Sequence, residues 1–231
     1  MKTSFSVFIP ARGGSKSIKD KNLQLINGIS LVERSIKLAL QRFEPKKIIL
    51  SSDSEKILNI GKKFSVDLHL RSKEASNDTA TTESAIKEWI LDNNEISKWI
   101  ILIEPTSPFI HLEDIDNLIN LCNKNNSSSC VYSVAEVRHT DHYLNQRINN
   151  KGRIDFIFEE LRKESRVKQK KVKTYKFGNI SAIKSEEIVN SKKFFSSNSI
   201  TFEVPFLRSI NIDSKEELII ARALSKFIED Y

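Results

Sequence analysis

A loop near the N-terminus carries the residue types that bind phosphate groups. It follows an apolar strand predicted over Phe5 to Ile9, and it combines two glycines with a serine and several cations. Glycines let backbone N–H groups approach phosphate oxygens without a Cβ in the way, and Arg and Lys supply positive charge. The stretch runs through Ala11, Arg12, Gly13, Gly14, Ser15 and Lys16 to Lys19, Lys21 and Asn22. This combination suits a nucleoside triphosphate, although a basic surface turn between a strand and a helix would have the same composition.

The spacing of these residues excludes two common nucleotide-binding motifs. The P-loop pattern G-x-x-x-x-G-K-[ST] is absent from the loop. The dinucleotide-binding fingerprint is absent too, because no third glycine follows at the required offset. The loop therefore predicts a different kind of triphosphate site.

Composition is typical of a single globular domain. The chain has 231 residues, 39% of them hydrophobic, which allows a sizeable core. The longest apolar run, Trp99 to Ile103, is far too short to span a membrane, and the first residues lack the features of a signal peptide. Cys122 and Cys130 have neither disulfide-scaffold nor metal-ligand spacing, which predicts reduced thiols. We therefore expect a cytoplasmic protein with no membrane partner.

The net charge of +7 is dispersed, apart from a basic run between Arg166 and Lys176. A nucleic-acid-binding module is one interpretation, but the chain lacks an RNP, helix-turn-helix or zinc signature. A solvated loop, or an anion-binding rim for a phosphorylated or carboxylated substrate, would also explain the run. We expect no nucleic-acid partner.

Strand and helix patterns alternate along the chain, which predicts an α/β fold with a doubly wound, mostly parallel sheet. The predicted strands are Phe5–Ile9, Ile48–Leu50, Val66–Leu70, Trp99–Ile103, Cys130–Val134, Tyr175–Ile183 and Ser199–Phe202. The predicted helices are Leu31–Leu40, Glu55–Phe64, Thr79–Leu91, Leu112–Asn123 and Lys215–Ile228. Ser54 is a candidate N-cap, and Ser214 with Glu217 forms a candidate capping box.

Ligands bind at the carboxyl ends of strands in such sheets. The loop after Ile9, the segment Ser51–Asp53 and the segment Glu104–Pro108 all follow predicted strands, so topology places them on one edge. The alternation breaks between about Ala135 and Lys176. We therefore predict one domain over residues 1–231, with a polar arm inserted at 135–176.

Ordered motifs along the chain resemble those of the CMP-sialic acid synthetases, or acylneuraminate cytidylyltransferases. The opening loop, continued by Lys21-Asn22-Leu23, looks like the first motif of that family. Five later segments resemble further motifs of the family. Arg71 with Asp78-Thr79-Ala80 resembles R-x-x-x-x-A-x-D-T-A, Glu104 to Pro108 resembles Q-P-T-S-P, and Lys168-Gln169 with Tyr175 resembles R-Q-x-x-P-x-x-[YF]. Phe194-Phe195 resembles the closing aromatic pair, and Asn211-Ile212-Asp213 resembles D-I-D. The resemblance implies a Rossmann-like nucleotidyltransferase fold in which the inserted arm serves dimerisation.

The resemblance also implies a reaction, in which the anomeric hydroxyl of a nonulosonic acid, an acidic nine-carbon sugar, attacks the α-phosphorus of CTP. The products are pyrophosphate and a CMP-sugar for cell-surface polysaccharide. Charge develops on the leaving pyrophosphate, so a fixed cation there stabilises the transition state more than the ground state. Arg12, Lys21 and Asp213 are the predicted catalytic residues. Asp213 and Asn211 are the predicted ligands of Mg²⁺, which prefers oxygen ligands and phosphates.

The same resemblance implies which residues contact each substrate, with Asn22 reading the cytosine edge. The predicted nucleotide-binding residues are Ala11, Arg12, Gly13, Gly14, Ser15, Lys16, Lys21, Asn22, Arg71, Ala80 and Thr82. The predicted sugar-binding residues are Glu104, Thr106, Ser107, Lys168, Gln169, Phe194 and Phe195. The arm implies a homodimer with shared active sites, to which Lys168, His139 and His142 of one subunit would contribute across the interface.

The chain departs from the family pattern mainly at positions around the sugar. Glu104 replaces a glutamine, Lys168 replaces an arginine, Asn211 replaces the first aspartate of D-I-D, and Gly178-Asn179 inverts an Asn-Gly. Lysine lacks the bidentate fork of arginine, and a carboxylate at position 104 repels an acidic sugar unless it is paired or protonated. The acceptor is therefore expected to be either sialic acid or an altered nonulosonate of the legionaminic or pseudaminic type. Another sugar nucleotidyltransferase, similar to the CMP-KDO synthetases, and a nucleotide-binding paralogue without catalysis remain alternatives.

Overall fold

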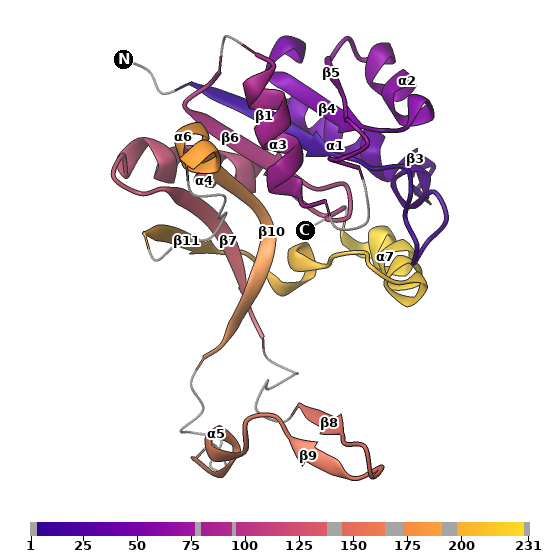
Figure 1. Ribbon diagram of the computed structural model, residues 1–231, viewed down its shortest axis with the longest axis vertical. Coiled ribbons are helices and arrows are strands. Elements are labelled where there is room, and N and C mark those ends of the chain that lie inside the picture. Colours follow the sequence, from indigo (N-terminus) through magenta and orange to yellow (C-terminus); the bar gives the residue numbers. More distant parts are fainter. Residues whose placement is uncertain are drawn as a thin grey trace.

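The computed structural model describes residues 4–76, 80–93, 96–137, 145–164, 173–190 and 198–228. They form a seven-stranded sheet with helices on both faces, and a separate small group of elements at the lower end of Figure 1. Among the described helices, none has an apolar stretch long enough to cross a membrane.

The order of elements follows the alternation that the sequence predicts. The strands are β1 (Phe5–Pro10), β2 (Leu25–Ile26), β3 (Ile29–Ser30), β4 (Ile48–Ser52), β5 (Asp67–Leu70), β6 (Trp99–Ile103), β7 (Cys130–Glu136), β8 (Gln146–Ile148), β9 (Ile154–Phe156), β10 (Tyr175–Lys184) and β11 (Ser199–Glu203). The α-helices are α1 (Leu31–Leu40), α2 (Glu55–Lys63), α3 (Thr82–Leu91), α4 (Leu112–Lys124), α5 (Glu159–Glu164), α6 (Ser185–Asn190) and α7 (Lys215–Ile228). Short 3-10 helices are η1 (Lys21–Leu23), η2 (Pro45–Lys47) and η5 (Phe206–Ser209).

The large sheet has the strand order β11-β7-β10-β6-β1-β4-β5. β1 pairs in parallel with β4 and β6, β4 with β5, and β7 with β11. This confirms the predicted doubly wound, mostly parallel sheet. β10 is the exception, because it runs antiparallel to both β6 and β7. The chain leaves the sheet along β7 and comes back along the neighbouring strand β10, and the two strands pair in opposite directions (Figure 1).

The sheet is buried on both faces, as expected of a parallel sheet. All five residues of β6 are buried at its centre. Along β1, Val7 and Ile9 pack into one apolar cluster with α1 and α4, whereas Phe8 packs into a second cluster with α3 and α6. Successive residues of a strand point to opposite faces, so two helical layers cover one apolar strand.

Helix boundaries agree closely with the sequence pattern, with two corrections, one to an N-cap and one to the start of α3. The predicted capping box of α7 is confirmed: the backbone N–H of Glu217 donates to Ser214 Oγ at 3.2 Å, and Ser214 N–H donates back to Glu217 Oε2 at 2.7 Å. Ser54 occupies the N-cap position of α2, but its side chain makes no capping hydrogen bond, contrary to prediction. Its own N–H donates to Ser52 Oγ at 3.0 Å. α3 begins at Thr82 rather than at the predicted Thr79, because the Thr81 hydroxyl caps it by accepting from the N–H of Ser84.

The segment predicted as an arm begins and ends as extensions of β7 and β10. Tyr175 pairs with Glu136, and the N–H of Val137 donates to the carbonyl of Thr174 at 2.8 Å. Beyond this ribbon, β8 and β9 form a two-stranded sheet beside α5, apart from the main sheet (Figure 1). Strands β7 and β10 therefore extend into both ends of the segment predicted as an arm.

Candidate active site

A pocket of about 370 Å³ lies at the carboxyl ends of the parallel strands. It is lined by Pro10, Arg12, Lys21, Asn22, Arg71, Ala80, Thr82, Glu104, Pro105, Thr106, Asn211 and Asp213. Apart from the two prolines, every one of these residues is a site residue predicted from the sequence. They come from the loops after β1, β5 and β6, from the start of α3 and from the segment before α7. The fold thus gathers distant motifs into one cavity, as expected for a doubly wound sheet.

The loop after β1 is fastened to the end of β4. Ala11 N–H donates to the Ser51 carbonyl at 2.9 Å, and Gly13 N–H donates to Asp53 Oδ1 at 2.7 Å. A Cβ on Gly13 would lie 2.8 Å from the Cβ of Ser54, so a glycine is needed for this close approach. The loop therefore holds its shape through the protein's own contacts. Its members Ala11, Gly13, Gly14, Ser15 and Lys16 are not among the residues that line the pocket.

Lys21 reaches across the pocket to the segment before α7. Its Nζ donates to the carbonyl of Ile212 at 3.0 Å and to Asp213 Oδ1 at 2.9 Å, and its side chain is only 15% exposed. Beside it, the buried Asn22 donates from Nδ2 to the carbonyl of Arg12 at 2.9 Å. These bonds give the cation of Lys21 a fixed position at the pocket wall.

Arg71 offers an unused donor to the pocket. Its Nε donates to Ser51 Oγ at 2.8 Å, whereas its buried Nη2 has no hydrogen-bond partner among the described residues. Burial, and to a lesser degree the charge of Arg12, lowers the pKa of Arg71, and Asp53 opposes this effect. A guanidinium nevertheless stays protonated in proteins. The orphaned N–H group is therefore a site for an anionic oxygen.

Asn211 and Asp213 present oxygen atoms to the same cavity. Asn211 donates from Nδ2 to Asp213 Oδ2, while its own buried Oδ1 has no partner among the described residues. Asp213 is 66% exposed, and its backbone N–H is held by Glu217 Oε2 at 2.7 Å. An orphaned carbonyl oxygen beside a carboxylate fits the oxygen ligands that Mg²⁺ prefers.

Glu104 is a carboxylate in a pocket otherwise rich in cations. It follows the central strand β6, and no described residue donates a hydrogen bond to its carboxylate. Burial raises the pKa of Glu104, the nearby Asp213 adds to the rise, and Lys21 partly offsets it. Its neighbour Thr106 lines the pocket too, and its carbonyl accepts from the N–H of Ile212 at 2.8 Å.

Several predicted residues lie elsewhere. Ser107 is buried, and its N–H donates to the Glu104 carbonyl at 3.0 Å, so it shapes the turn after β6. Gly178 and Asn179 lie at an irregularity in β10, where Asn179 Nδ2 donates to Asp114 Oδ2 at 3.0 Å. This departure from the family pattern is thus a buried structural position. Lys168, Gln169, Phe194, Phe195, His139, His142, Asp78 and Thr79 lie outside the described residues.

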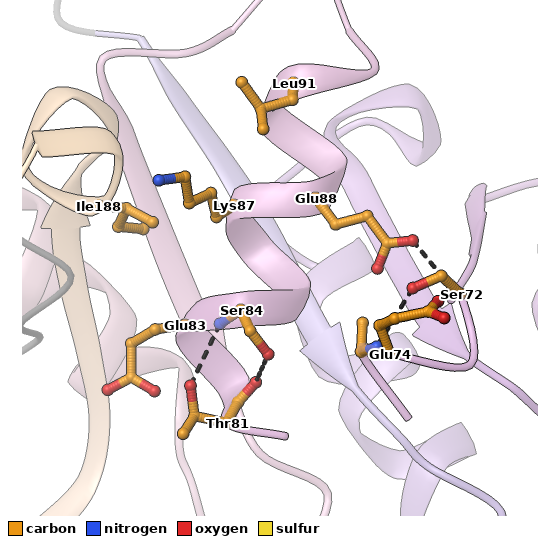
Figure 2. A pocket seen from close by; sticks show the side chains of 10 residues that line it. Ser72, Glu74, Thr81, Glu83, Ser84, Lys87, Glu88, Leu91 and Ile188 are labelled. Carbon is orange, nitrogen blue, oxygen red and sulfur yellow. Dashed lines mark hydrogen bonds between the residues drawn. The ribbon is translucent and has the colours of Figure 1, made fainter. Parts of the chain in front are cut away.

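A second, larger hollow of about 580 Å³ lies along the outer face of α3 (Figure 2). Its walls include Ser72, Ser84, Lys87, Glu88 and Ile188. None of the predicted site residues within the described ranges lines it. Figure 2 shows part of its polar lining paired internally, since Ser84 bonds to Thr81 and Glu88 accepts from the N–H of Ser72. The smaller, cation-rich pocket is therefore the candidate active site.

Comparison with known proteins agrees with the motifs in this pocket. The family model described as "Cytidylyltransferase" matches residues 6–192. The chain belongs to the cytidylyltransferase family. It is 25% identical to the N-acylneuraminate cytidylyltransferase of Escherichia coli O18:K1:H7 over 221 residues, which are 96% of this chain and 52% of the relative. It is 28% identical to the pseudaminic acid cytidylyltransferase of Campylobacter jejuni over 231 residues, 94% of each chain.

This chain thus spans about half the length of the Escherichia coli relative and nearly all of the Campylobacter relative. Among solved structures, a CMP:2-keto-3-deoxy-manno-octonic acid synthetase complexed with CTP matches with a TM-score of 0.73, over 97% of this chain and 99% of that one. The identity to that structure is 15%, so the likeness concerns the fold. This supports the predicted nucleotidyltransferase architecture.

Proposed function

We propose that this cytidylyltransferase joins CTP to a nonulosonic acid, giving a CMP-sugar and pyrophosphate. One observation carries the proposal: a single pocket brings together three cationic side chains, the oxygens of Asn211 and Asp213, and Glu104. The cations suit a triphosphate, and the oxygens suit the divalent ion that accompanies it. Membership of the cytidylyltransferase family supports cytosine as the base.

In the proposed reaction, Arg12, Lys21 and Arg71 orient the triphosphate and balance its charge. The anomeric hydroxyl of the sugar attacks the α-phosphorus, the bond to the β-phosphate breaks, and the hydroxyl proton goes to solvent. Lys21 is fixed by two hydrogen bonds before the substrates arrive, so little reorganisation accompanies the charge that develops on pyrophosphate. Asn211 Oδ1 and the Asp213 carboxylate would hold Mg²⁺, which supplies further charge compensation when bound.

The acceptor is proposed to be a nonulosonate of the pseudaminic or legionaminic type. Glu104 supports this choice, because an unpaired carboxylate at the pocket wall can accept hydrogen bonds from N–H groups. Amino-substituted sugars of this type carry such N–H groups. The C. jejuni relative named for pseudaminic acid matches nearly the full chain, which agrees with this choice. A KDO-type sugar stays an alternative, supported by the structural match to the synthetase of that name.

We also propose that the protein is a cytoplasmic homodimer in which the 135–176 arm packs against a second copy and completes its site. The arm carries exposed apolar side chains, including Ile148 at 77% and Ile154 at 62% exposure. Isolated exposed apolar residues are ordinary, but a group of them on a small extension is typical of an interface. Light scattering tests this proposal, and a strict monomer at micromolar concentration would refute it.

The reaction is tested by incubating the protein with CTP, Mg²⁺ and a panel of nonulosonic acids and measuring pyrophosphate release. We expect turnover with at least one pseudaminic- or legionaminic-type sugar, and CTP to raise the melting temperature more than UTP or GTP does. Turnover with a KDO-type sugar alone would shift the assignment to that class. Tight CTP binding without turnover of any sugar would make the protein a nucleotide-binding paralogue.

A further inference from the structure

The side of α3 that faces β5 carries metal-binding side chains that the proposed reaction leaves unused. His69 of β5, Glu88 of α3 and Asp92 at the end of α3 each present one ligand atom, and these atoms lie within 4.8 Å of one another. Glu88 and Asp92 are four residues apart, so a helix places them on the same face. None of the three lines the candidate active site.

Two buried polar atoms in this cluster lack a hydrogen-bond partner among the described residues: Nε2 of His69 and Oε2 of Glu88. His69 is only 7% exposed. The other polar atom of each side chain is engaged. His69 Nδ1 lies 2.9 Å from Ser51 Oγ. Figure 2 shows the second bond, in which Glu88 Oε1 accepts from the N–H of Ser72 at 2.8 Å. Leaving two such atoms unpaired is unfavourable, and one shared cation would satisfy both.

The surrounding charge favours a cation. Glu88, Asp92 and Asp67 all act on His69 as negative charges, against the single positive charge of Arg71. Asp92 is the C-cap residue of α3, whose last turn carries no basic residue. Acidic side chains are unfavourable at the negative end of a helix dipole, so a cation there would be stabilised by the helix as well as by its ligands.

We propose that His69 Nε2, Glu88 and Asp92 bind a divalent transition-metal ion, with Zn²⁺ as the representative species. One imidazole and two carboxylates suit such an ion better than Mg²⁺, which prefers oxygen ligands alone. Burial lowers the pKa of His69, which keeps the imidazole neutral and able to coordinate. Asp92 is exposed and provides the route from solvent, and three protein ligands leave a fourth position for water.

A metal at this site would also hold one wall of the candidate active site. With Nε2 coordinated, Nδ1–H of His69 donates to Ser51 Oγ, the same oxygen that accepts from Arg71 Nε at 2.8 Å. The ion would therefore link β5 to α3 and fix the position of the Ser51 hydroxyl, which accepts the hydrogen bond from Arg71. The proposed metal binding can be tested apart from the proposed reaction, because none of the three ligands lines the pocket.

The test uses the untagged 231-residue chain, stripped of metal with a chelator. Titration calorimetry with Zn²⁺ should give one equivalent bound, and Co²⁺ should give the visible absorption of a four-coordinate site. Asp92→Asn and Glu88→Gln should each weaken Zn²⁺ binding by at least about tenfold. Asp67→Asn is the matched control, since it removes an exposed carboxylate from the same strand without removing a ligand, and it should bind as wild type.

Other outcomes overturn the proposal. One such outcome is that the stripped protein does not bind Zn²⁺. The other is that both Asp92→Asn and Glu88→Gln bind Zn²⁺ with the affinity of the wild type. Loss of binding in Asp213→Asn alone would mean that Zn²⁺ occupies the candidate active site instead. Because the readouts are stoichiometry, affinity and absorption, failure of pyrophosphate release with every sugar would not affect this result. Circular dichroism of each variant checks that the fold is kept.

Discussion

Replacing Lys21 by alanine separates catalysis from stability. Its ion pair with the 66% exposed Asp213 and its bond to the Ile212 carbonyl should each stabilise the fold by about 1 kcal/mol. Removing a fixed donor from charge that develops in a transition state costs about 10²- to 10³-fold in kcat, or about 2.7–4 kcal/mol. Lys21→Ala should therefore fold, with a free energy of unfolding lowered by about 2 kcal/mol, and react at least a hundredfold more slowly.

The assay is pyrophosphate release at saturating CTP with the best sugar of the panel, alongside urea unfolding of the same preparation. Lys37→Ala is the matched control, because Lys37 forms a comparable 2.8 Å ion pair with Glu33 on α1, away from the pocket. It should lose little stability and no activity. A Lys21→Ala enzyme that keeps its rate within a few-fold of wild type would show that the cation plays no part in the chemistry.

Three further perturbations test other parts of the structure. Burial raises the pKa of Glu104 above its usual 4.5, so the free energy of unfolding of the wild type falls as pH rises through the raised value. In urea unfolding, Glu104→Gln should therefore be as stable as the wild type at pH 4 and more stable than it at pH 8. Asn211→Asp adds a charged oxygen where Asn211 now has an orphaned one, and should lower the Mg²⁺ concentration needed for half-maximal rate. Gly178→Ala places a Cβ 2.3 Å from Ser133 Oγ and should cost about 1–3 kcal/mol of stability, whereas Gly14→Ala, which meets nothing within 4 Å, should cost far less.

Local pattern was sufficient to predict the elements whose residues are buried on a regular period. Helices α1 and α7 and strand β6 begin and end where the sequence predicts them. Strand direction could not be predicted in this way, because the apolar run of β10 is the same whether it pairs parallel or antiparallel. Helix α6 has six residues, too few for a period to stand out, and β8 exposes all three of its residues. Their formation depends on the rest of the fold rather than on their own sequence.

The lining of the pocket was predictable because ordered motifs and the strand-end rule point to the same residues. The contacts that hold those residues were not. Nothing in the sequence pairs Gly13 with Asp53, or joins His69 to Arg71 through Ser51, since these bonds link residues 18 to 40 positions apart, on neighbouring strands or just after them. Such partners become visible only when β1, β4 and β5 lie side by side.

The hydrogen bond between Val137 and Thr174 has a consequence for how the chain is divided. It brings the two ends of the segment predicted as an arm together at the tip of the paired strands β7 and β10, so that segment leaves and re-enters the sheet at one point. Insertions with adjacent ends can be excised and replaced by a short turn at little cost in loop entropy. We therefore predict that a chain trimmed at this bond keeps its sheet and its pocket, and that any property lost on trimming belongs to the removed segment.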